Sequence, residues 1–161
     1  FFQEEYISFA IGGQHKTKIL PTEKIIEICK NLNKKIVLIG GKEDEKRGER
    51  IQKKIGKQIF NACGKFTINQ SAYIVNQSEY IITHDTGMMH IASALNKKII
   101  SIWGNTIPDF GMYPYNPHLD NKIIEVKGLS CRPCSKIGFN KCPKGHFNCM
   151  NKIDVNLFLN K

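Results

Sequence analysis

The sequence contains no uninterrupted apolar run of about 18 residues, the length that a membrane-spanning helix needs. It also lacks a basic leader followed by an apolar stretch and a small-residue cleavage site. We therefore expect a soluble protein of the cytoplasm. The chain opens without Met, and a strand-like run begins by Tyr6, which is typical of a piece of a longer protein.

Two common nucleotide-binding signatures are also missing. The glycine-bearing loop GGQHKTK, residues 12–18, is neither a Walker loop nor a G-x-G-x-x-G fingerprint, so nucleotide binding by those routes is not supported. No internal repeat and no low-complexity linker divides the 161 residues. Because 41% of the residues are hydrophobic, the chain can bury a core of its own. We expect one domain over residues 1–161.

Acidic residues are comparatively scarce. The chain has 24 Lys and Arg against 14 Asp and Glu, which gives a formal net charge of +10. Such a surplus favours anionic partners such as phosphates, acidic lipid headgroups or nucleic acid. The lysines are spread from Lys16 to Lys161, so an ordinary solvated surface is the alternative interpretation.

Short apolar runs alternate with segments of helical periodicity along most of the chain. The expected strands are residues 6–11, 35–40, 58–64, 80–83, 98–104 and 122–126. The expected helices are residues 22–32, 43–55, 67–78 and 87–95, with a closing helix at 153–161 capped by Asp154. Uniformly apolar strands alternating with helices are typical of a parallel sheet covered on both faces. The sequence therefore predicts an α/β fold with a doubly wound, mostly parallel, Rossmann-like sheet.

An acid, a hydroxyl and a glycine meet where the fourth expected strand ends, and a histidine follows one turn later. In an open parallel sheet, ligands bind beyond the carboxyl ends of the strands. A helix that begins near Gly87 offers unpaired N–H groups and the positive end of its dipole to an anion, and Thr86 adds a hydroxyl. Asp85 is suited to sugar hydroxyls, and His90 can reach the same ligand. The alternative is that Asp85 only caps the helix and His90 only packs in an interface.

Two other loops are expected at the same edge of the sheet. The glycine loop ends in Lys18, a cation that can balance a phosphate group. Glu43 and Asp44 follow the second strand, where an acid can accept ribose hydroxyls in dinucleotide-binding folds. An ordinary first-turn acid of a helix explains them equally well.

Six cysteines are unevenly placed along the chain. Cys29 and Cys63 are solitary, whereas a C-x2-C-x7-C-x6-C pattern joins the other four, Cys131, Cys134, Cys142 and Cys149. Grouped thiols in an intracellular chain indicate metal or redox chemistry before a secreted disulfide framework. A structural zinc or iron ion is one interpretation, and reduced thiols or a disulfide formed during handling are the other.

These segments together resemble glycosyltransferase family nine, the lipopolysaccharide heptosyltransferases. THDTGMMHIASAL, followed by KKIISIWGNTIPDFGMYPY, is similar to that family's donor-site pattern D-[ST]-G-x-x-H-x-A-A-x-L and its G-x-T-x-P loop. GGQHKTKILPTEKI is similar to the basic loop of the family, and CRPCSKIGFNKCPKGHFNCM is similar to its cysteine-bearing tail. The resemblance covers nearly the whole chain.

The resemblance implies the C-terminal, donor-binding half of a two-domain GT-B enzyme, without its N-terminal acceptor domain. The implied reaction is inverting transfer of a heptose or related sugar from an ADP-sugar to a lipopolysaccharide core, with no cofactor required for the chemistry. The base would lie in the N-terminal half, so we expect this chain to bind donor weakly without turnover. The implied donor-binding residues are Gly13, Gln14, Lys18, Glu43, Phe66, Asp85, Thr86, Gly87 and His90.

In that scheme, Lys18, Thr86 and the Gly87 N–H hold the diphosphate. Asp85 accepts sugar hydroxyls and His90 shapes or bonds the site. Glu43 binds ribose, Phe66 lies near the base, and Gly13 and Gln14 make backbone contacts only.

Two alternatives stay open. A UDP-sugar is a possible donor on the same architecture, because nothing in the sequence reads the base directly. A basic cysteine-knuckle module for nucleic acid would need lysines and aromatic side chains gathered near the cysteines. Only Phe139 and Phe147 lie there, beside Lys136, Lys141 and Lys144, so we expect no nucleic-acid partner. The expected partners are the sugar donor, the lipopolysaccharide acceptor, the N-terminal domain and, peripherally, the anionic inner face of the inner membrane.

Overall fold

The computed structural model describes residues 3–115 and 118–159. The described residues form a six-stranded sheet in the order β3-β2-β1-β4-β5-β6, in which every neighbouring pair is parallel. The predicted doubly wound α/β fold is thereby confirmed. The strands are β1 (Tyr6–Ala10), β2 (Lys35–Ile39), β3 (Ile59–Asn61), β4 (Ile81–His84), β5 (Ile99–Trp103) and β6 (Lys122–Glu125).

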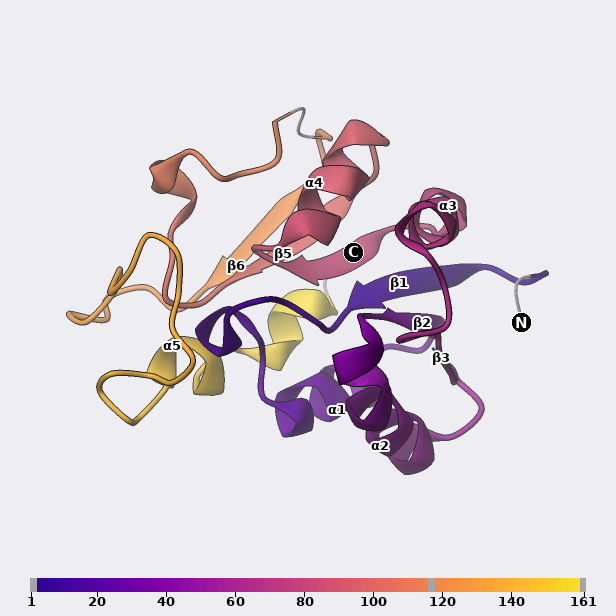
Figure 1. Ribbon diagram of the computed structural model, residues 1–161, viewed down its shortest axis with the longest axis horizontal. Coiled ribbons are helices and arrows are strands. Elements are labelled where there is room, and N and C mark those ends of the chain that lie inside the picture. Colours follow the sequence, from indigo (N-terminus) through magenta and orange to yellow (C-terminus); the bar gives the residue numbers. More distant parts are fainter. Residues whose placement is uncertain (1–2, 116–117, 160–161) are drawn as a thin grey trace.

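The strand ends are level across the middle of the sheet. Ala10 of β1 is opposite Ile39 of β2, and His84 of β4 is opposite Ile102 of β5. The loops that follow these strands therefore leave from one edge, on the left of Figure 1, where the arrowheads point. The strand order reverses between β1 and β4, and this switch point is where open α/β sheets bind ligands.

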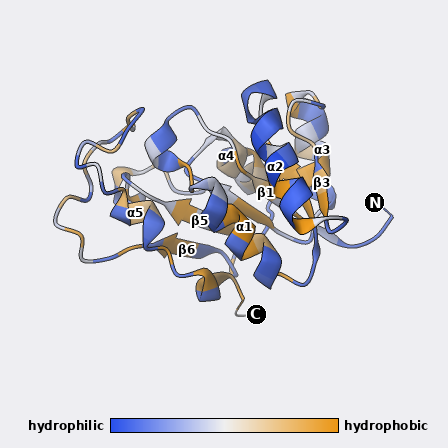
Figure 2. Ribbon diagram, turned by 90° about the horizontal axis from the view of Figure 1, so that it is seen from below, coloured by the Kyte–Doolittle hydropathy of each residue, from blue (hydrophilic) through white to orange (hydrophobic). Residues whose placement is uncertain are grey.

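Helices cover both faces of the sheet (Figure 1). On one face lie α1 (Thr22–Asn31) and α2 (Glu45–Ile55), and on the other lie α3 (Ile68–Gln77) and α4 (Gly87–Ala94). Each pair packs its apolar side chains on one face of the sheet, which gives two buried clusters. Figure 2 shows the result as hydrophobic strands inside helices whose outer surfaces are hydrophilic.

Local sequence signals explain several helix ends. Thr67 caps α3 as expected, because its hydroxyl accepts from the Gln70 amide and the Gln70 side chain bonds back to the Thr67 amide. Asp154 also caps as expected, with its carboxylate accepting from the Asn156 amide at 2.9 Å. The element that it caps, however, is a single 3₁₀ turn, Val155–Phe158. The last two residues of the predicted closing helix, 160–161, lie outside the described residues.

Irregular segments follow β5 and β6. The loop from residue 104 to residue 121 contains one 3₁₀ turn, Pro108–Phe110, and residues 116–117 within it lie outside the described part. The cysteine-rich segment, residues 128–150, runs beside the turn at residues 16–18 and ends in the short helix α5 (Asn148–Asn151), which was not predicted. Among the described residues, no helix is both long and apolar enough to cross a membrane.

Candidate functional site

A cavity of about 490 Å³ opens at the carboxyl edge of the sheet, at the switch point. Its walls come from the loops after β1 and β2, from the start of α3 and from the start of α4. Nine residues were predicted to bind the donor, and six of them line this cavity: Gly13, Gln14, Glu43, Phe66, Thr86 and Gly87.

The glycine loop and the β4–α4 junction meet at this edge, as the sequence predicts. A Cβ atom at Gly13 would lie only 2.9 Å from Thr86 Cγ2, so glycine is what allows the two loops to approach. The turn at residues 16–18 then brings the Lys18 ammonium to the junction, where Nζ lies 2.6 Å from Asp85 Oδ2.

Asp85 is the partner of Lys18 in this structure. The side chains are 4% exposed for Asp85 and 11% exposed for Lys18. Asp85 Oδ2 also accepts a hydrogen bond of 2.9 Å from the Thr106 hydroxyl in the loop after β5. The N-cap of α4 is Thr86, so the alternative in which Asp85 merely caps that helix is wrong. Among the described residues, the lining of the cavity includes neither Lys18 nor Asp85.

The N-terminus of α4 offers hydrogen-bond donors to the cavity. Thr86 has extended backbone angles, φ −145° and ψ 171°, and its side chain makes no capping bond within the described part of the chain. Around Gly87 the described atoms leave open space, since a Cβ there would meet nothing within 4 Å. Thr86, Gly87 and Met88 all line the cavity. A free hydroxyl beside first-turn amides is an arrangement that binds phosphate groups.

The two histidines near the junction, His84 and His90, do not lie where the sequence led us to expect a ligand-binding histidine. His90 is exposed on α4 and, among the described residues, does not contribute to the cavity lining. His84, the last residue of β4, is fully buried, and its Nε2 accepts from the Leu20 amide at 3.0 Å. Burial lowers the pKa of His84 to about 3, so the ring is neutral at pH 7. This hydrogen bond fixes the backbone at Leu20, two residues after Lys18. The only sequence signal for this role is its place at the end of an apolar strand.

Of the two acids after β2, only Asp44 is held inside the site. Glu43 is exposed, whereas Asp44 is buried, and both line the cavity. Asp44 Oδ2 accepts from the Gly41 amide at 3.1 Å, and Asp44 Oδ1 lies 3.9 Å from a guanidinium nitrogen of Arg47. Burial raises the pKa of the Asp44 carboxyl, against the opposing effects of these two neighbours. Arg47 itself donates to the carbonyls of Ile11 and Leu20, which ties α2 to the glycine loop.

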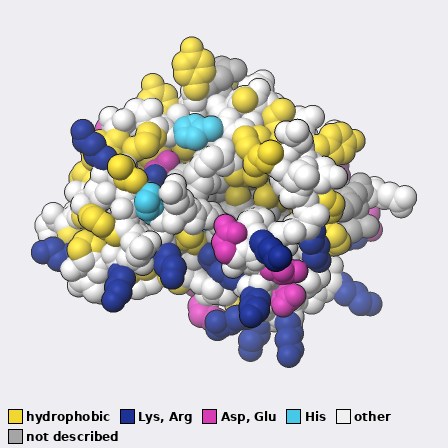
Figure 3. Space-filling view, in the orientation of Figure 1, with side chains coloured by type: hydrophobic (Ala, Val, Ile, Leu, Met, Phe, Trp, Pro, Cys, Tyr) yellow, Lys and Arg dark blue, Asp and Glu magenta, His cyan; other side chains and the backbone are white. Residues whose placement is uncertain are grey.

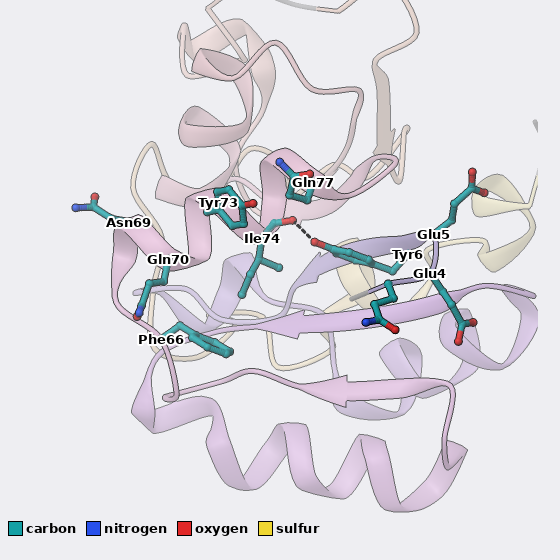
Figure 4. Close-up of a pocket in the computed structure, with 10 residues that line it drawn as sticks. Glu4, Glu5, Tyr6, Phe66, Asn69, Gln70, Tyr73, Ile74 and Gln77 are labelled. Carbon is teal, nitrogen blue, oxygen red and sulfur yellow. Dashed lines mark hydrogen bonds between the residues drawn. The ribbon is translucent and has the colours of Figure 1, made fainter. Parts of the chain in front are cut away.

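A second groove, of about 780 Å³, runs along α3 beside the first described residues (Figure 4). Its floor includes Tyr6, whose hydroxyl donates to the Ile74 carbonyl at 2.8 Å. Phe66, 36% exposed, lines both this groove and the cavity at the switch point. Phe66 therefore borders both the groove and the cavity.

The four grouped cysteines lie near one another. All six cysteines of the chain are free thiols. The pKa of Cys149 is raised to about 11 and that of Cys134 is also raised, first by burial and then by the charges of neighbouring thiols. Cys131 Sγ lies 3.9 Å from His146 Nε2. Nevertheless, within residues 3–115 and 118–159 no three Cys, His, Asp or Glu side chains form a group that could hold a metal ion. The metal site on these cysteines stays a prediction.

The strand order, the reversal between β1 and β4 and the cavity at that point define a Rossmann-like α/β domain. Residues 1–142 match the model of glycosyltransferase family 9 (heptosyltransferase). The chain belongs to this family, as the motifs in its sequence indicate.

Known proteins similar to the chain are longer than it is. Lipopolysaccharide heptosyltransferase 2 of Escherichia coli K12 is 26% identical over 147 residues, which cover 86% of this chain and 39% of that protein. The crystal structure of the family 9 glycosyl transferase from Veillonella parvula has a TM-score of 0.76 at 22% identity, covering 99% of this chain and 45% of that one. The structure of the iron-containing dodecameric heptosyltransferase TibC of enterotoxigenic E. coli, in complex with ADP-D-β-D-heptose, has a TM-score of 0.68 at 18% identity. The match covers 98% of this chain and 44% of that one. The chain thus spans less than half the length of each.

Proposed function

We propose that this chain is the donor-binding part of a heptosyltransferase. In this proposal the enzyme transfers a heptose or a related sugar, with inversion, from an ADP-sugar to a lipopolysaccharide core acceptor. Membership of family 9 supports the class of reaction. The observation that carries the proposal is the meeting of Lys18 with the β4–α4 junction, beside a cavity that the α4 N-terminus lines.

The diphosphate of the donor would bind at the start of α4. The Gly87 amide and the Thr86 hydroxyl supply hydrogen-bond donors, and Lys18 supplies the cation. Charge builds on the leaving diphosphate as the bond to the sugar breaks, and fixed donors placed there stabilise it. Asp85 is bonded through Oδ2 to Lys18 and Thr106, so Oδ1 is the proposed acceptor for sugar hydroxyls.

The nucleoside would occupy the rest of the cavity. Asp44, held in place by burial, joins Glu43 as an acceptor for ribose hydroxyls, and Phe66 offers a ring to the base. Gly13 and Gln14 contribute backbone contacts. The role predicted for His90 stays a prediction, since the side chain lies outside the cavity lining among the described residues.

The chemistry also needs a base on the face of the sugar opposite the leaving group. We propose that this base belongs to the acceptor domain of the same enzyme, so this chain binds donor without turning it over. The proposal includes a cytoplasmic location with peripheral contact to an anionic membrane, which the net charge of +10 favours.

Titration calorimetry with ADP and with adenosine tests the proposal. Lys18→Met is expected to weaken ADP binding about 10- to 100-fold, because a hydrogen bond to a charged group contributes about 1.5–3 kcal/mol. Adenosine, which lacks the diphosphate, should bind both proteins equally. The matched control is Lys16→Met, because Lys16 lies in the same turn and is exposed. If ADP and adenosine lose affinity equally, Lys18 does not bind the diphosphate.

A second variant separates binding from folding. Thr86→Val keeps the methyl group that faces Gly13 and replaces the hydroxyl with a second methyl group. We expect ADP affinity to fall by about 10-fold or more, because the hydroxyl donates to a charged phosphate group and such a bond contributes about 1.5–3 kcal/mol, while the thermal midpoint stays near that of the native chain. Unchanged ADP affinity would remove Thr86 from the site.

The two alternatives have direct tests. Titration with UDP in place of ADP measures base preference, and tighter binding of UDP would favour the UDP-sugar alternative. Figure 3 shows Lys and Arg side chains on the left and lower parts of this face, mixed with acids over α2, which does not favour a nucleic-acid patch. Filter binding with a steep salt dependence would support nucleic acid instead.

The four-cysteine site is a separate prediction. TibC, a structural neighbour, is an iron-containing protein, and four thiolates suit tetrahedral zinc or iron. Elemental analysis of protein purified without added metal decides between the two interpretations: about one zinc or iron ion per chain would support a four-ligand site, and no metal would support reduced thiols or a disulfide formed during handling. Metal retained after all four cysteines are replaced by serine would place it elsewhere.

A further inference from the structure

The cysteine-rich segment is bonded to the glycine loop after β1 and to the loop after β5, which contacts Asp85. The backbone and hydroxyl of Thr17 each donate to the Phe139 carbonyl at 3.1 Å, and the Phe139 amide donates back to the Thr17 hydroxyl at 2.8 Å. The Cys134 amide donates to the Asn105 carbonyl at 3.2 Å. Thr17 directly precedes Lys18, so the segment holds the lysine turn from the outside.

Arg132 makes the strongest of these connections. Its side chain is 8% exposed. Its guanidinium donates to the carbonyls of Gly104, at 2.6 Å, and Thr106, at 2.9 Å, and to the Glu125 carboxylate, at 2.6 Å. These three bonds fix the loop after β5 to the end of β6. Charge-assisted bonds to a planar fork also fix direction, which a single ammonium group cannot do.

The loop that Arg132 holds is joined in turn to Lys18. The Thr106 hydroxyl donates to Asp85 Oδ2 at 2.9 Å, and the same oxygen lies 2.6 Å from Lys18 Nζ. Thr106 is fully buried and Asp85 is 4% exposed, so little water competes for these bonds. One continuous path of bonds therefore runs from Arg132 through Thr106 and Asp85 to Lys18.

We propose that Arg132 is a positioning residue for the donor site, which acts through Thr106 and Asp85 to hold Lys18 in place. The inference rests on the proposed function, in which Lys18 binds the donor diphosphate. Without Arg132, the loop after β5 loses the guanidinium bonds to its Gly104 and Thr106 carbonyls, and Asp85 loses its fixed position. The Lys18 ammonium then samples positions away from the β4–α4 junction, and ADP binds more weakly.

Loss of Arg132 can weaken ADP binding in two further ways that involve no positioning of Lys18. The positive charge of Arg132 could attract ADP directly, or the side chain could only stabilise the fold. A double-mutant cycle separates these effects from positioning, because residues that act through one another have non-additive effects. If Arg132 acts through Lys18, its removal has no further effect once Lys18 is gone.

The experiment compares ADP affinity by calorimetry in the native chain, Arg132→Gln, Lys18→Met and the double variant. Arg132→Gln is expected to weaken binding at least about fivefold alone and less than about twofold in the Lys18→Met background, a difference within the usual range of coupling between contacting residues. The control is Lys141→Gln, which removes one charge from an exposed side chain of the same segment and should change nothing. Equal losses in both backgrounds, or no loss from Arg132→Gln, would overturn the positioning role.

A spectroscopic signature gives a second, independent readout. An ammonium group in a protected ion pair exchanges its protons slowly, so the Lys18 Nζ group should give a separate nitrogen–proton NMR signal. We expect this signal to vanish in Arg132→Gln and Arg132→Lys and to persist in Lys141→Gln. If the signal persists in Arg132→Gln, the inference is overturned, whatever the ADP affinity of that variant is. Failure of the proposed function is distinguishable, since then the native chain does not bind ADP or Lys18→Met leaves the affinity unchanged.

Discussion

Replacing Asp85 with asparagine tests whether its ion pair with Lys18 is a protected interaction that prepares the site. The carboxylate and ammonium groups are 2.6 Å apart, in side chains that are 4% and 11% exposed. Asparagine keeps the shape of the side chain and an oxygen for the Thr106 hydroxyl, and removes only the counter-charge. The Lys18 ammonium is then left with little water and without its partner.

The expected effect on stability is large for the single variant and small for the double variant. At an effective dielectric of about 20, two unit charges at this separation attract by roughly 6 kcal/mol. Taking both ions from water costs several kcal/mol each, so the net contribution of the pair is small. Removing one partner of such a pair lowers the free energy of unfolding by about 3–5 kcal/mol, because the other charge stays without compensation. Asp85→Asn with Lys18→Met should recover most of this loss.

Urea unfolding followed by circular dichroism measures these changes, provided that the dependence on urea concentration is the same for all variants. Glu23→Gln is the control, because it breaks an ion pair with Arg50 whose side chains are 68% and 59% exposed. That change should lower the free energy of unfolding by less than about 1 kcal/mol. Two outcomes would show that Lys18 is not held as the structure indicates. One is that Asp85→Asn lowers the free energy of unfolding no more than the control does, and the other is that the double variant is no more stable than Asp85→Asn alone.

Three further predictions concern the framework of the site. The pKa of His84 falls from 6.5 to about 3 on folding, so between these pH values the unfolded chain binds a proton that the folded chain does not. The free energy of unfolding should therefore fall by roughly 2 kcal/mol between pH 6.5 and 5. His84→Gln should lose this pH dependence in urea titrations, and a pH dependence that persists in the variant would have another origin. Gly48→Ala should destabilise the fold by about 1–3 kcal/mol, because the new Cβ would lie 2.1 Å from Asn61 Oδ1. In an unhindered helix the same change stabilises by about 1 kcal/mol, so a rise in the thermal midpoint of Gly48→Ala would contradict this prediction. Thr67→Ala should cost about 1 kcal/mol in the same assay through loss of the α3 cap, whereas Thr67→Ser should retain it.

Local patterns in the sequence were enough to predict the sheet and the edge at which the candidate cavity opens. Runs such as Ile36–Ile39 are apolar throughout because parallel strands are buried on both faces. Glycine, threonine and acid residues at strand ends then indicate the carboxyl edge, since helix N-termini and close backbone approach require those residue types. The placement of Gly13, Thr86 and Gly87 at one cavity follows from these rules. The family was recognisable for the same reason, because its motifs are short and contiguous.

The sequence by itself determined the order of strands and helices along the chain, the edge that carries the candidate cavity and six of the residues that line it, because each depends on neighbours along the chain. Only the tertiary structure decided which partner each charged side chain finds. The pairing of Asp85 with Lys18 and the anchoring by Arg132 join residues from separate elements. The burial of Asp44 depends on packing against the glycine loop, where a Cβ atom at Gly12 would lie 2.1 Å from Asp44 Oδ2. Such contacts depend on packing between segments that are distant in the sequence. The periodicity or spacing of one segment does not indicate which side chains of another segment will pack against it.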